Sequence, residues 1–181
     1  MKWNIDTTHS AASFAVKHLM ISTVKGQFRT LEGKGVTRAD GTLESVEMTI
    51  DVASIDTNAP QRDDHLRSPD FFDAASHPKI SFRSTAIERR GSDLTITGDL
   101  TIRGTTRPVT LAGEYTTPTN DPWGNSRAAL TVSGKISRKD WGLTWNQALE
   151  TGGVVVGDDV KLSVDVEAVA VAADTAALAA V

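Results

Sequence analysis

Alternation of apolar and polar residues runs through most of this chain, and no other feature limits its fold as strongly. From Leu94 to Ile102, Leu, Ile and Gly alternate with Thr and Asp without a break. A period of two places successive side chains on opposite faces of a β-strand. The pattern recurs in segments that begin near residues 12, 24, 46, 80, 94, 109, 128 and 160, and we expect the second to extend to Val36. The sequence therefore predicts about eight strands, each with one apolar and one polar face.

The arrangement of these strands follows from what separates them. No helical pattern alternates with the strands, which excludes a parallel βαβ sheet. One-sided strands that follow each other directly are typical of an antiparallel sheet, and Asp40-Gly41 is a strong hairpin-turn signal. Eight such strands can close into a barrel without exposed edges, while a two-sheet sandwich is the competing architecture. The predicted fold class is all-β, an eight-stranded antiparallel β-barrel.

Residues 54–77 interrupt the alternation. This connection predicts a short helix, with Asn58 as its N-cap and Pro60 in its first turn. Phe71 and Phe72 follow the helix and place two aromatic side chains next to each other. We expect the whole connection to lie over one mouth of the barrel.

Residues 137–157 form the second interruption. They include the pair Gly152-Gly153 and few strand signals, which predicts a long loop folded over another part of the barrel. The chain length is typical of one domain, which we place at residues 1–171. The Ala-rich residues 172–181 are predicted to be a disordered tail, because short isolated helices are marginal in water.

Charge and composition exclude several classes of protein. The net charge is −4 and no basic run occurs, so the sequence predicts no nucleic-acid surface. The absence of cysteine rules out disulfides and zinc–thiolate sites. No segment approaches the roughly 20 apolar residues that span a bilayer. The chain as given begins without a signal peptide, so we expect a cytoplasmic protein, or a periplasmic or secreted one if such a peptide was removed.

Small residues fall on the apolar faces of several predicted strands. Gly26, Gly98, Gly113 and Gly134 are in register with the large apolar residues. They either allow the strands to bend or leave room along the barrel axis. In the second case, leucine at Gly98 should block the interior. An apolar interior with free space would hold an acyl or isoprenoid chain, at about 25 cal/mol per Å² of apolar surface removed from water.

Catalytic and metal-binding patterns are weak. None of the four histidines, His9, His18, His65 and His77, lies four residues from another, and there is no H-E-x-x-H. A G-x-S-x-G nucleophile elbow is also absent. His18 is a lone histidine on an apolar face, either a core residue or a polar contact for the head group of a ligand. We therefore predict no catalytic residues, no metal site and no enzymatic activity.

Residues near the long loop leave further alternatives open. Arg138 either meets an anionic head group at the barrel rim or forms an ion pair with Asp140. Trp141 and Trp145 either fill the barrel or stack against a ligand. The sequence alone does not choose between these roles.

The order of motifs along the chain resembles that of the YceI-like family. The matching segments are WNIDTTHS (3–10), FAVKH (14–18), VKGQF (24–28), SIDT (54–57), RDDHL (62–66), DFFD (70–73), HPKISFRST (77–85), GDLTIRG (98–104) and SRKDWG (137–142). In the last motif, Ser137 and Trp141 stand where the family more often has Asn and Phe. The likeness covers about residues 3–170.

The resemblance implies a lipocalin-like barrel that carries an elongated apolar ligand for transport, storage or sequestration. The implied ligand is a polyisoprenoid, such as a polyprenyl phosphate or a quinone, or a fatty-acyl lipid. No other cofactor is expected, and the resemblance also suggests a homodimer. Two alternatives stay open: a filled barrel that acts in stress response or protein interaction, and an enzyme of isoprenoid metabolism, which the sequence supports least.

Inward parity and the two interruptions together select the candidate ligand-binding residues. Those with inward parity are Phe14, Val16, His18, Phe28, Met48, Ile50, Phe82, Leu100 and Ile102. Those from the two interrupting segments are Phe71, Phe72, Trp141 and Trp145.

Overall fold

Strands make up most of the protein, whose structure is a computed structural model that describes residues 1–150 and 152–171. The predicted tail, 172–181, lies outside the described residues. The strands are β1 (Lys2–Ile5), β2 (Ala11–His18), β3 (Ser22–Phe28), β4 (Leu31–Thr37), β5 (Leu43–Asp51), β6 (Ile55–Asp56), β7 (Lys79–Arg90), β8 (Asp93–Ile102), β9 (Thr105–Asn120), β10 (Ser126–Ser137) and β11 (Val156–Ala170). The helices are the 3₁₀ turns η1 (Val52–Ser54) and η2 (Arg138–Trp141) and the α-helix α1 (Pro60–Arg67).

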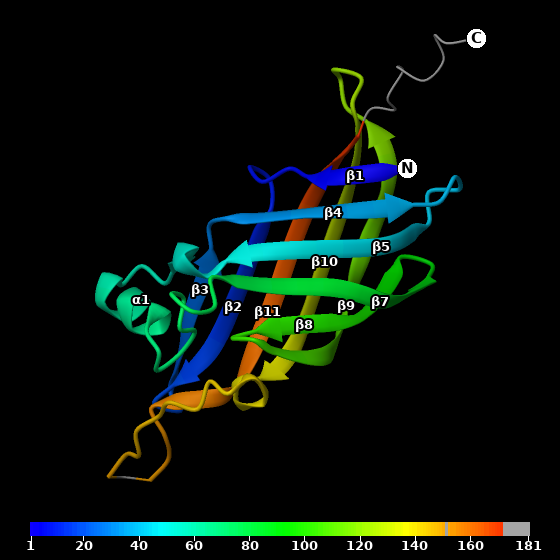
Figure 1. The fold of residues 1–181 in the computed structure, drawn as a ribbon. Coiled ribbons are helices and arrows are strands. Elements are labelled where there is room, and N and C mark those ends of the chain that lie inside the picture. The colour runs from blue at the N-terminus through cyan, green and yellow to red at the C-terminus, as the bar shows by residue number, and fades with distance from the viewer. Residues whose placement is uncertain (151, 172–181) are drawn as a thin grey trace, which may run out of the picture.

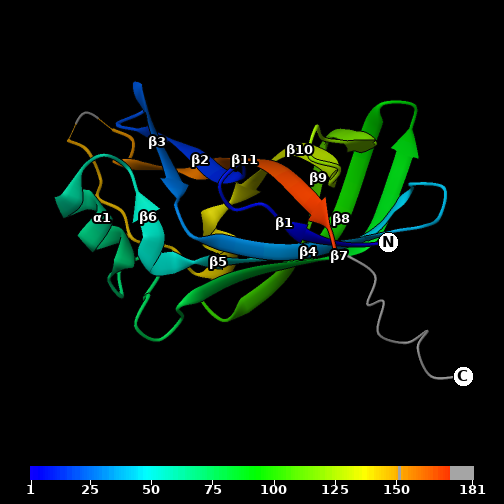
Figure 2. The same ribbon diagram turned by 90° about the horizontal axis from the view of Figure 1, so that it is seen from above.

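Eight strands close into an antiparallel ring in the order β1-β4-β5-β7-β8-β9-β10-β11, with β11 paired back to β1 (Figure 1). This confirms the predicted eight-stranded antiparallel barrel. Three further strands, β2, β3 and β6, continue from the free part of the same edge of β11. Helix α1 and β6 lie at one end, on the same side as the loop before β11 (Figure 2). The predicted helix in 54–77 and the long loop in 137–157 are therefore both present.

Two strand assignments differ from the sequence-based prediction. β1 was not predicted, because four residues are too few to show a period of two, although Trp3 is buried and its Nε1 donates to Thr37 Oγ1 at 2.9 Å. The extension of the second strand to Val36 was wrong, since the chain bends between β3 and β4. Phe28 and Leu31 are both buried and lie three positions apart, so the inward parity changes at the bend.

Large side chains cover the glycines of the barrel wall. A Cβ atom on Gly26 would lie 2.4 Å from Phe14 Cζ, and one on Gly98 would lie 2.5 Å from Phe82 Cζ. At Gly113 the obstacle is the backbone, because a Cβ would lie 1.8 Å from the carbonyl oxygen of Thr131. The glycine positions are thus occupied by their neighbours rather than open to the interior. That leucine at Gly98 blocks the interior stays a prediction, and in the structure such a side chain would first meet the Phe82 ring and the carbonyl oxygen of Arg83.

Arg127 on β10 joins three parts of the chain at the end of the barrel near the N-terminus. Its Nε donates to Asp121 Oδ2 at 2.8 Å and its Nη1 to Asp6 Oδ2 at 3.0 Å, and it also pairs with Glu167. The hydrogen bond from Arg127 holds the pKa of Asp121 well below its usual range. The pKa of Asp6 is lowered chiefly by the Thr8 hydroxyl, then by His9 and Arg127.

Gly113→Ala tests the close approach of two strands. We expect the free energy of unfolding to fall by about 1–3 kcal/mol or more, because the new methyl group meets backbone that cannot turn aside. Gly35→Ala is the matched control, since its Cβ would come no closer than 3.4 Å to a neighbour. Equal unfolding free energies for the two variants in urea would contradict this packing.

Arg127→Met tests the charge network through its pH dependence. The variant should be less stable at neutral pH, because three carboxylates lose their shared cation. The folded pKa of Asp121 lies below its unfolded value of about 3.9, so the stabilisation is present above that pH and is lost as pH falls toward the folded pKa. The difference in unfolding free energy from the wild type should therefore shrink below about pH 4.

The control for this prediction is Lys135→Met, which removes an exposed ion pair with Asp159. Exposed pairs contribute little, so this variant should differ slightly from the wild type at every pH. A stability difference for Arg127→Met that stays constant from neutral to acidic pH would argue against the lowered pKa of Asp121.

Candidate functional site

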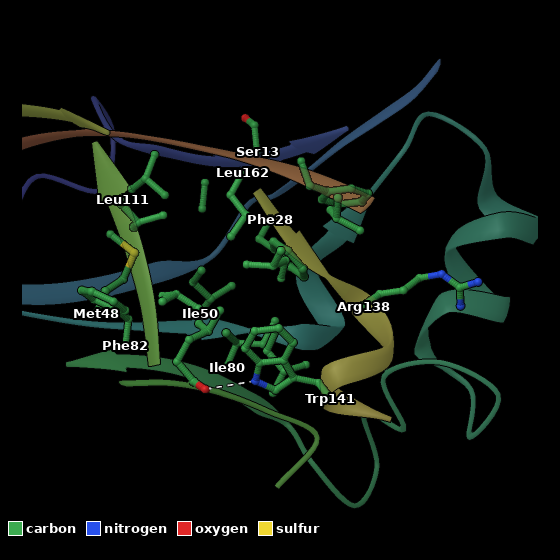
Figure 3. A pocket seen from close by; sticks show the side chains of 18 of the residues that line it. Ser13, Phe28, Met48, Ile50, Ile80, Phe82, Leu111, Arg138, Trp141 and Leu162 are labelled. Carbon is green, nitrogen blue, oxygen red and sulfur yellow. Dashed lines mark hydrogen bonds between the residues drawn. The ribbon is translucent and has the colours of Figure 1, made fainter. Parts of the chain in front are cut away.

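An apolar cavity of about 180 Å³ lies inside the barrel (Figure 3). One water molecule needs only about 10–15 Å³ of such space. The wall consists almost entirely of aliphatic and aromatic side chains from the strands, from η2 and from the segment around α1. At the far end Trp3 and Tyr115 are buried, beside a separate void of about 40 Å³. The cavity therefore extends toward the end of the barrel that α1 covers.

Eleven of the predicted ligand-binding residues line this cavity. They come from both sources, the inward parity and the interrupting segments, and are Phe14, Val16, Phe28, Met48, Ile50, Phe71, Phe72, Phe82, Leu100, Ile102 and Trp141. The structure thus brings residues that are distant in sequence around one space. Their role in binding a ligand stays a prediction.

His18 and Trp145 are not in the wall. His18 has the inward parity of Phe14 and Val16, but it is the last residue of β2 and does not line the cavity, although its cross-strand partner Val156 does. Trp145 packs from outside against His65 and Phe71, with ring centroids 4.8 and 5.2 Å apart. Trp145 therefore supports Phe71 from behind and does not face the interior.

The prediction also missed part of the wall. Residues with inward strand parity that were not selected are Ala12, Val46, Ile80, Ile96, Val109, Leu111, Leu130, Val132, Ile136, Val160, Leu162 and Val164. The alternation of apolar and polar residues already assigns these residues to the inward face, so it could have identified them. Leu66, Leu143 and Val156 also line the cavity, and they come from α1, the long loop and the start of β11, where no period marks an inward face.

Arg138 is the one charged residue of the cavity wall among the described residues, and its guanidinium points away from the apolar side chains (Figure 3). It is only 4% exposed, and it donates to the carbonyl oxygens of Leu143, Trp145 and Gly157 at 2.5, 2.9 and 2.9 Å. Burial lowers the pKa of Arg138, and the charge of Asp158 opposes this shift. Of the two alternatives for Arg138, the ion pair with Asp140 is wrong, since the carboxylate partner is Asp158, with Nη2 3.4 Å from Oδ1.

Trp141 closes the wall next to Arg138. Its side chain is buried, and its Nε1 donates to the carbonyl oxygen of Leu100 at 3.0 Å. Ser13, the other polar residue of the wall, turns its hydroxyl outward (Figure 3). The polar groups near the cavity thus face away from its interior, so the interior itself is apolar.

The lid segment, residues 57–74, covers the cavity with Leu66, Phe71 and Phe72. A buried carboxylate shapes its start, because Asp63 Oδ1 accepts from Thr57 N at 2.9 Å and from Thr57 Oγ1 at 2.6 Å. The predicted N-cap was wrong by one position: the N-cap is Ala59, without a side-chain bond. Asn58, the residue expected there, instead has a φ of +59°.

Arg67 attaches the lid segment to the barrel. Its Nη2 donates to the carbonyl oxygen of Ile55 at 2.8 Å and its Nε to that of Ala53 at 2.9 Å. Phe72 meets Phe28 edge to face, with ring centroids 5.9 Å apart. The lid is thus held by polar bonds at its base and by apolar contact over the cavity.

One group of potential metal ligands occurs within residues 1–150 and 152–171, namely Asp6, His9 and Glu167. It lies outside the cavity wall. Arg127 already pairs with both carboxylates, so their negative charges are shared with a cation of the chain itself. In the same part of the chain, no helix is long and apolar enough to cross a bilayer.

These features define a small antiparallel β-barrel with an apolar cavity in its interior. The sequence model of the YceI-like domain matches residues 3–168. The chain belongs to the YceI-like family, as its motifs predicted.

Curated relatives agree with this assignment. Protein YceI from Escherichia coli O17:K52:H18 (strain UMN026 / ExPEC) is 40% identical over 136 residues, which are 75% of this chain and 71% of the relative. Protein YceI from Salmonella newport (strain SL254) is 38% identical over 137 residues, or 75% and 72% of the two chains. The similarity thus extends over most of the barrel.

Solved structures show the same fold. BcnA from Burkholderia cenocepacia has a TM-score of 0.75 at 25% identity and covers 90% of this chain and 98% of its own. The YCEI protein from Campylobacter jejuni has a TM-score of 0.74 at 30% identity, covering 86% and 90%. A polyisoprenoid binding domain from Saccharophagus degradans has a TM-score of 0.65 at 14% identity, covering 93% and 98%, and shows the fold alone.

Arg138→Lys tests the bonds that hold the long loop. The donors of lysine sit on one nitrogen and cannot span the acceptors that Nε, Nη1 and Nη2 of Arg138 reach, so buried acceptors lose their donors and stability should fall by about 1–3 kcal/mol. Limited proteolysis within residues 143–150 should become faster. Lys139→Arg is the control, because it keeps a charge beside Asp158. Unchanged proteolysis of Arg138→Lys would show that other contacts hold the loop.

Proposed function

We propose that the protein binds one elongated apolar chain inside the barrel, for transport, storage or sequestration rather than for catalysis. The observation that carries this proposal is the interior cavity with an apolar wall and outward-facing polar groups. Each methylene group moved from water into such a wall contributes about 0.8 kcal/mol. The wall offers little to recognise a polar substrate, which favours an acyl or isoprenoid chain.

The chemistry of the wall also favours binding over catalysis. General acid–base catalysis needs a side chain within hydrogen-bond reach of the reacting atom. Among the described residues of the wall, Ser13 and Arg138 are polar, and both turn away from the cavity (Figure 3). The donors of Arg138 are engaged by backbone carbonyl oxygens and Asp158.

A polyisoprenoid is the first ligand to test. The Saccharophagus degradans neighbour is described as a polyisoprenoid binding domain, and it shares the barrel with this chain. Its low sequence identity supports the fold and leaves the ligand of this chain to experiment. A quinone, a polyprenyl phosphate and a fatty acid all offer the apolar chain that the wall suits.

The size of the cavity implies a movement on binding. Pockets for drug-sized ligands measure about 300–1,000 Å³, and this cavity is smaller, at about 180 Å³. A long chain therefore fits when the side chains over the cavity, Leu66, Phe71 and Phe72, shift outward. Since Trp3 and Tyr115 fill the opposite end, we propose that the ligand enters on the side of the lid segment.

Mass spectrometry of an organic extract of the purified protein tests this function. We expect a stoichiometric polyisoprenoid or fatty-acyl molecule, or uptake of an added polyprenyl quinone by protein that was first stripped of lipid. A stripped, folded protein that takes up neither a quinone nor a fatty acid would favour the filled barrel that acts without a lipid.

Ala12→Phe tests the location of the ligand. Ala12 is the smallest residue of the wall, so a ring there should project into the cavity and compete with the bound chain. We expect uptake to weaken at least about tenfold, equal to ~1.4 kcal/mol of binding free energy. Ala15→Phe places the same ring at a position of β2 that does not line the cavity and should bind normally. Equal uptake by both variants would place the ligand elsewhere.

A further inference from the structure

The hairpin between β2 and β3 ends in an exposed apolar tip, residues 19–21. Met20 is 60% exposed and Ile21 is 81% exposed. The other large apolar side chains that are strongly exposed in the described chain, Met1, Trp123 and Val171, are not adjacent in sequence. Single exposed apolar residues are common on soluble proteins, whereas adjacent ones at a loop tip call for a physical explanation.

Backbone conformation makes this tip more unusual. Leu19 and Met20 have φ values of +52° and +62°, and Ile21 N donates to the His18 carbonyl oxygen at 3.2 Å to close the turn. Turns with two positive φ values favour Asn and Gly, because the left-handed region strains other L-residues. The apolar side chains of Leu19 and Met20 are therefore contrary to the residue preference of this turn.

The tip adjoins the covered end of the cavity. Leu19 N donates to the carbonyl oxygen of Val155 at 2.8 Å, and His18 pairs with Val156 across the strands. Val156 itself lines the cavity. In Figure 1 this tip lies at the lower end of the barrel, where the loop before β11 also lies, and the turn between β9 and β10 that holds Trp123 lies at the upper end.

Three lysines share one face beside the tip. Lys25 and Lys161 are both cross-strand neighbours of Ala15, and Lys17 lies two residues from Ala15 on the same face of β2. All three lysines are exposed, and none forms an ion pair within residues 1–150 and 152–171. In contrast, the nearby Lys135 pairs with Asp159 at 2.8 Å. The end of the barrel that carries the tip therefore combines apolar side chains with three exposed lysines that form no ion pair among the described residues.

We propose that residues 19–21 dock into the surface of an anionic lipid bilayer, with Lys17, Lys25 and Lys161 facing the head groups. Apolar side chains that enter the interface and lysines that attract anionic lipids are the two contributions that bind peripheral proteins to membranes. Docking in this orientation holds the covered end of the cavity at the membrane, where an apolar chain can pass without crossing water. This last consequence rests on the proposed function, whereas docking itself does not.

Co-sedimentation with vesicles tests the docking. The wild-type protein should bind vesicles of phosphatidylcholine and phosphatidylglycerol more tightly than vesicles of phosphatidylcholine alone, and added salt should weaken the binding. Met20→Ser with Ile21→Ser should weaken binding to the anionic vesicles about tenfold or more. Both residues are exposed, so this variant should unfold at the temperature of the wild type.

Two further variants separate docking from a structural role. Leu19→Asn with Met20→Gly installs the residues that the turn favours, so we expect a higher unfolding temperature together with weaker vesicle binding. Trp123→Ser is the matched control, because it removes an exposed apolar residue from the opposite end and should bind vesicles like the wild type. If the apolar tip has a structural role, the Leu19→Asn and Met20→Gly variant should instead have a lower unfolding temperature than the wild type.

The outcomes also separate this proposal from the proposed function. Wild-type protein that does not bind anionic vesicles, or a Met20→Ser and Ile21→Ser variant that binds them equally well, would overturn the docking. Lipid in the organic extract would still support the proposed function in that case. If docking serves loading, the serine variant should keep its capacity for a quinone added in detergent but take it up more slowly from anionic vesicles.

Discussion

Barrel closure depends on β11, because two strands, β1 and β2, pair with different parts of the same edge of this strand. Its last residues pair with β1 and complete the ring, while its earlier residues pair with β2. Beside β11, the wall is therefore formed by β1 at one end of the molecule and by β2 and β3 at the other. Helix α1 lies over the end where β3 and β6 pair (Figure 2). The cavity extends to this end. The change of partner along β11, from β2 to β1, thus separates the filled end of the barrel from the end that contains the cavity.

The packing of rings over glycines explains how the interior keeps its space. Phe14 lies over Gly26 and Phe82 lies over Gly98, so each ring rests against the wall of the barrel. A larger residue at either glycine would push the ring toward the axis. The glycines therefore open the interior indirectly, through the side chains that they accommodate. This joins the two interpretations that the sequence left open, since the same residues relieve the strands and preserve the volume.

The alternation in the sequence was sufficient to predict the barrel and most of its inward face, because a period of two assigns each residue to a side. It could not predict which inward-facing residues line the cavity, and His18 has the inward parity but does not line it. Neither could it predict the bend after Phe28 or the short strand at Trp3. Arg138 contacts the carbonyl oxygens of Leu143, Trp145 and Gly157 in the segment that follows it, and such side-chain to backbone bonds leave no periodic pattern in the sequence, so only the structure reveals them.

The lid segment has a consequence for the rate at which a bound chain leaves. Its base is fixed by Arg67 and Asp63, whereas the side chains of Phe72 and Leu66 cover the cavity through apolar contacts. A short segment of this kind can open on the microsecond to millisecond timescale of loop motions while the barrel stays folded. The residence time of a ligand would then be set by how often these side chains part, and the barrel could hold a chain weakly yet release it slowly.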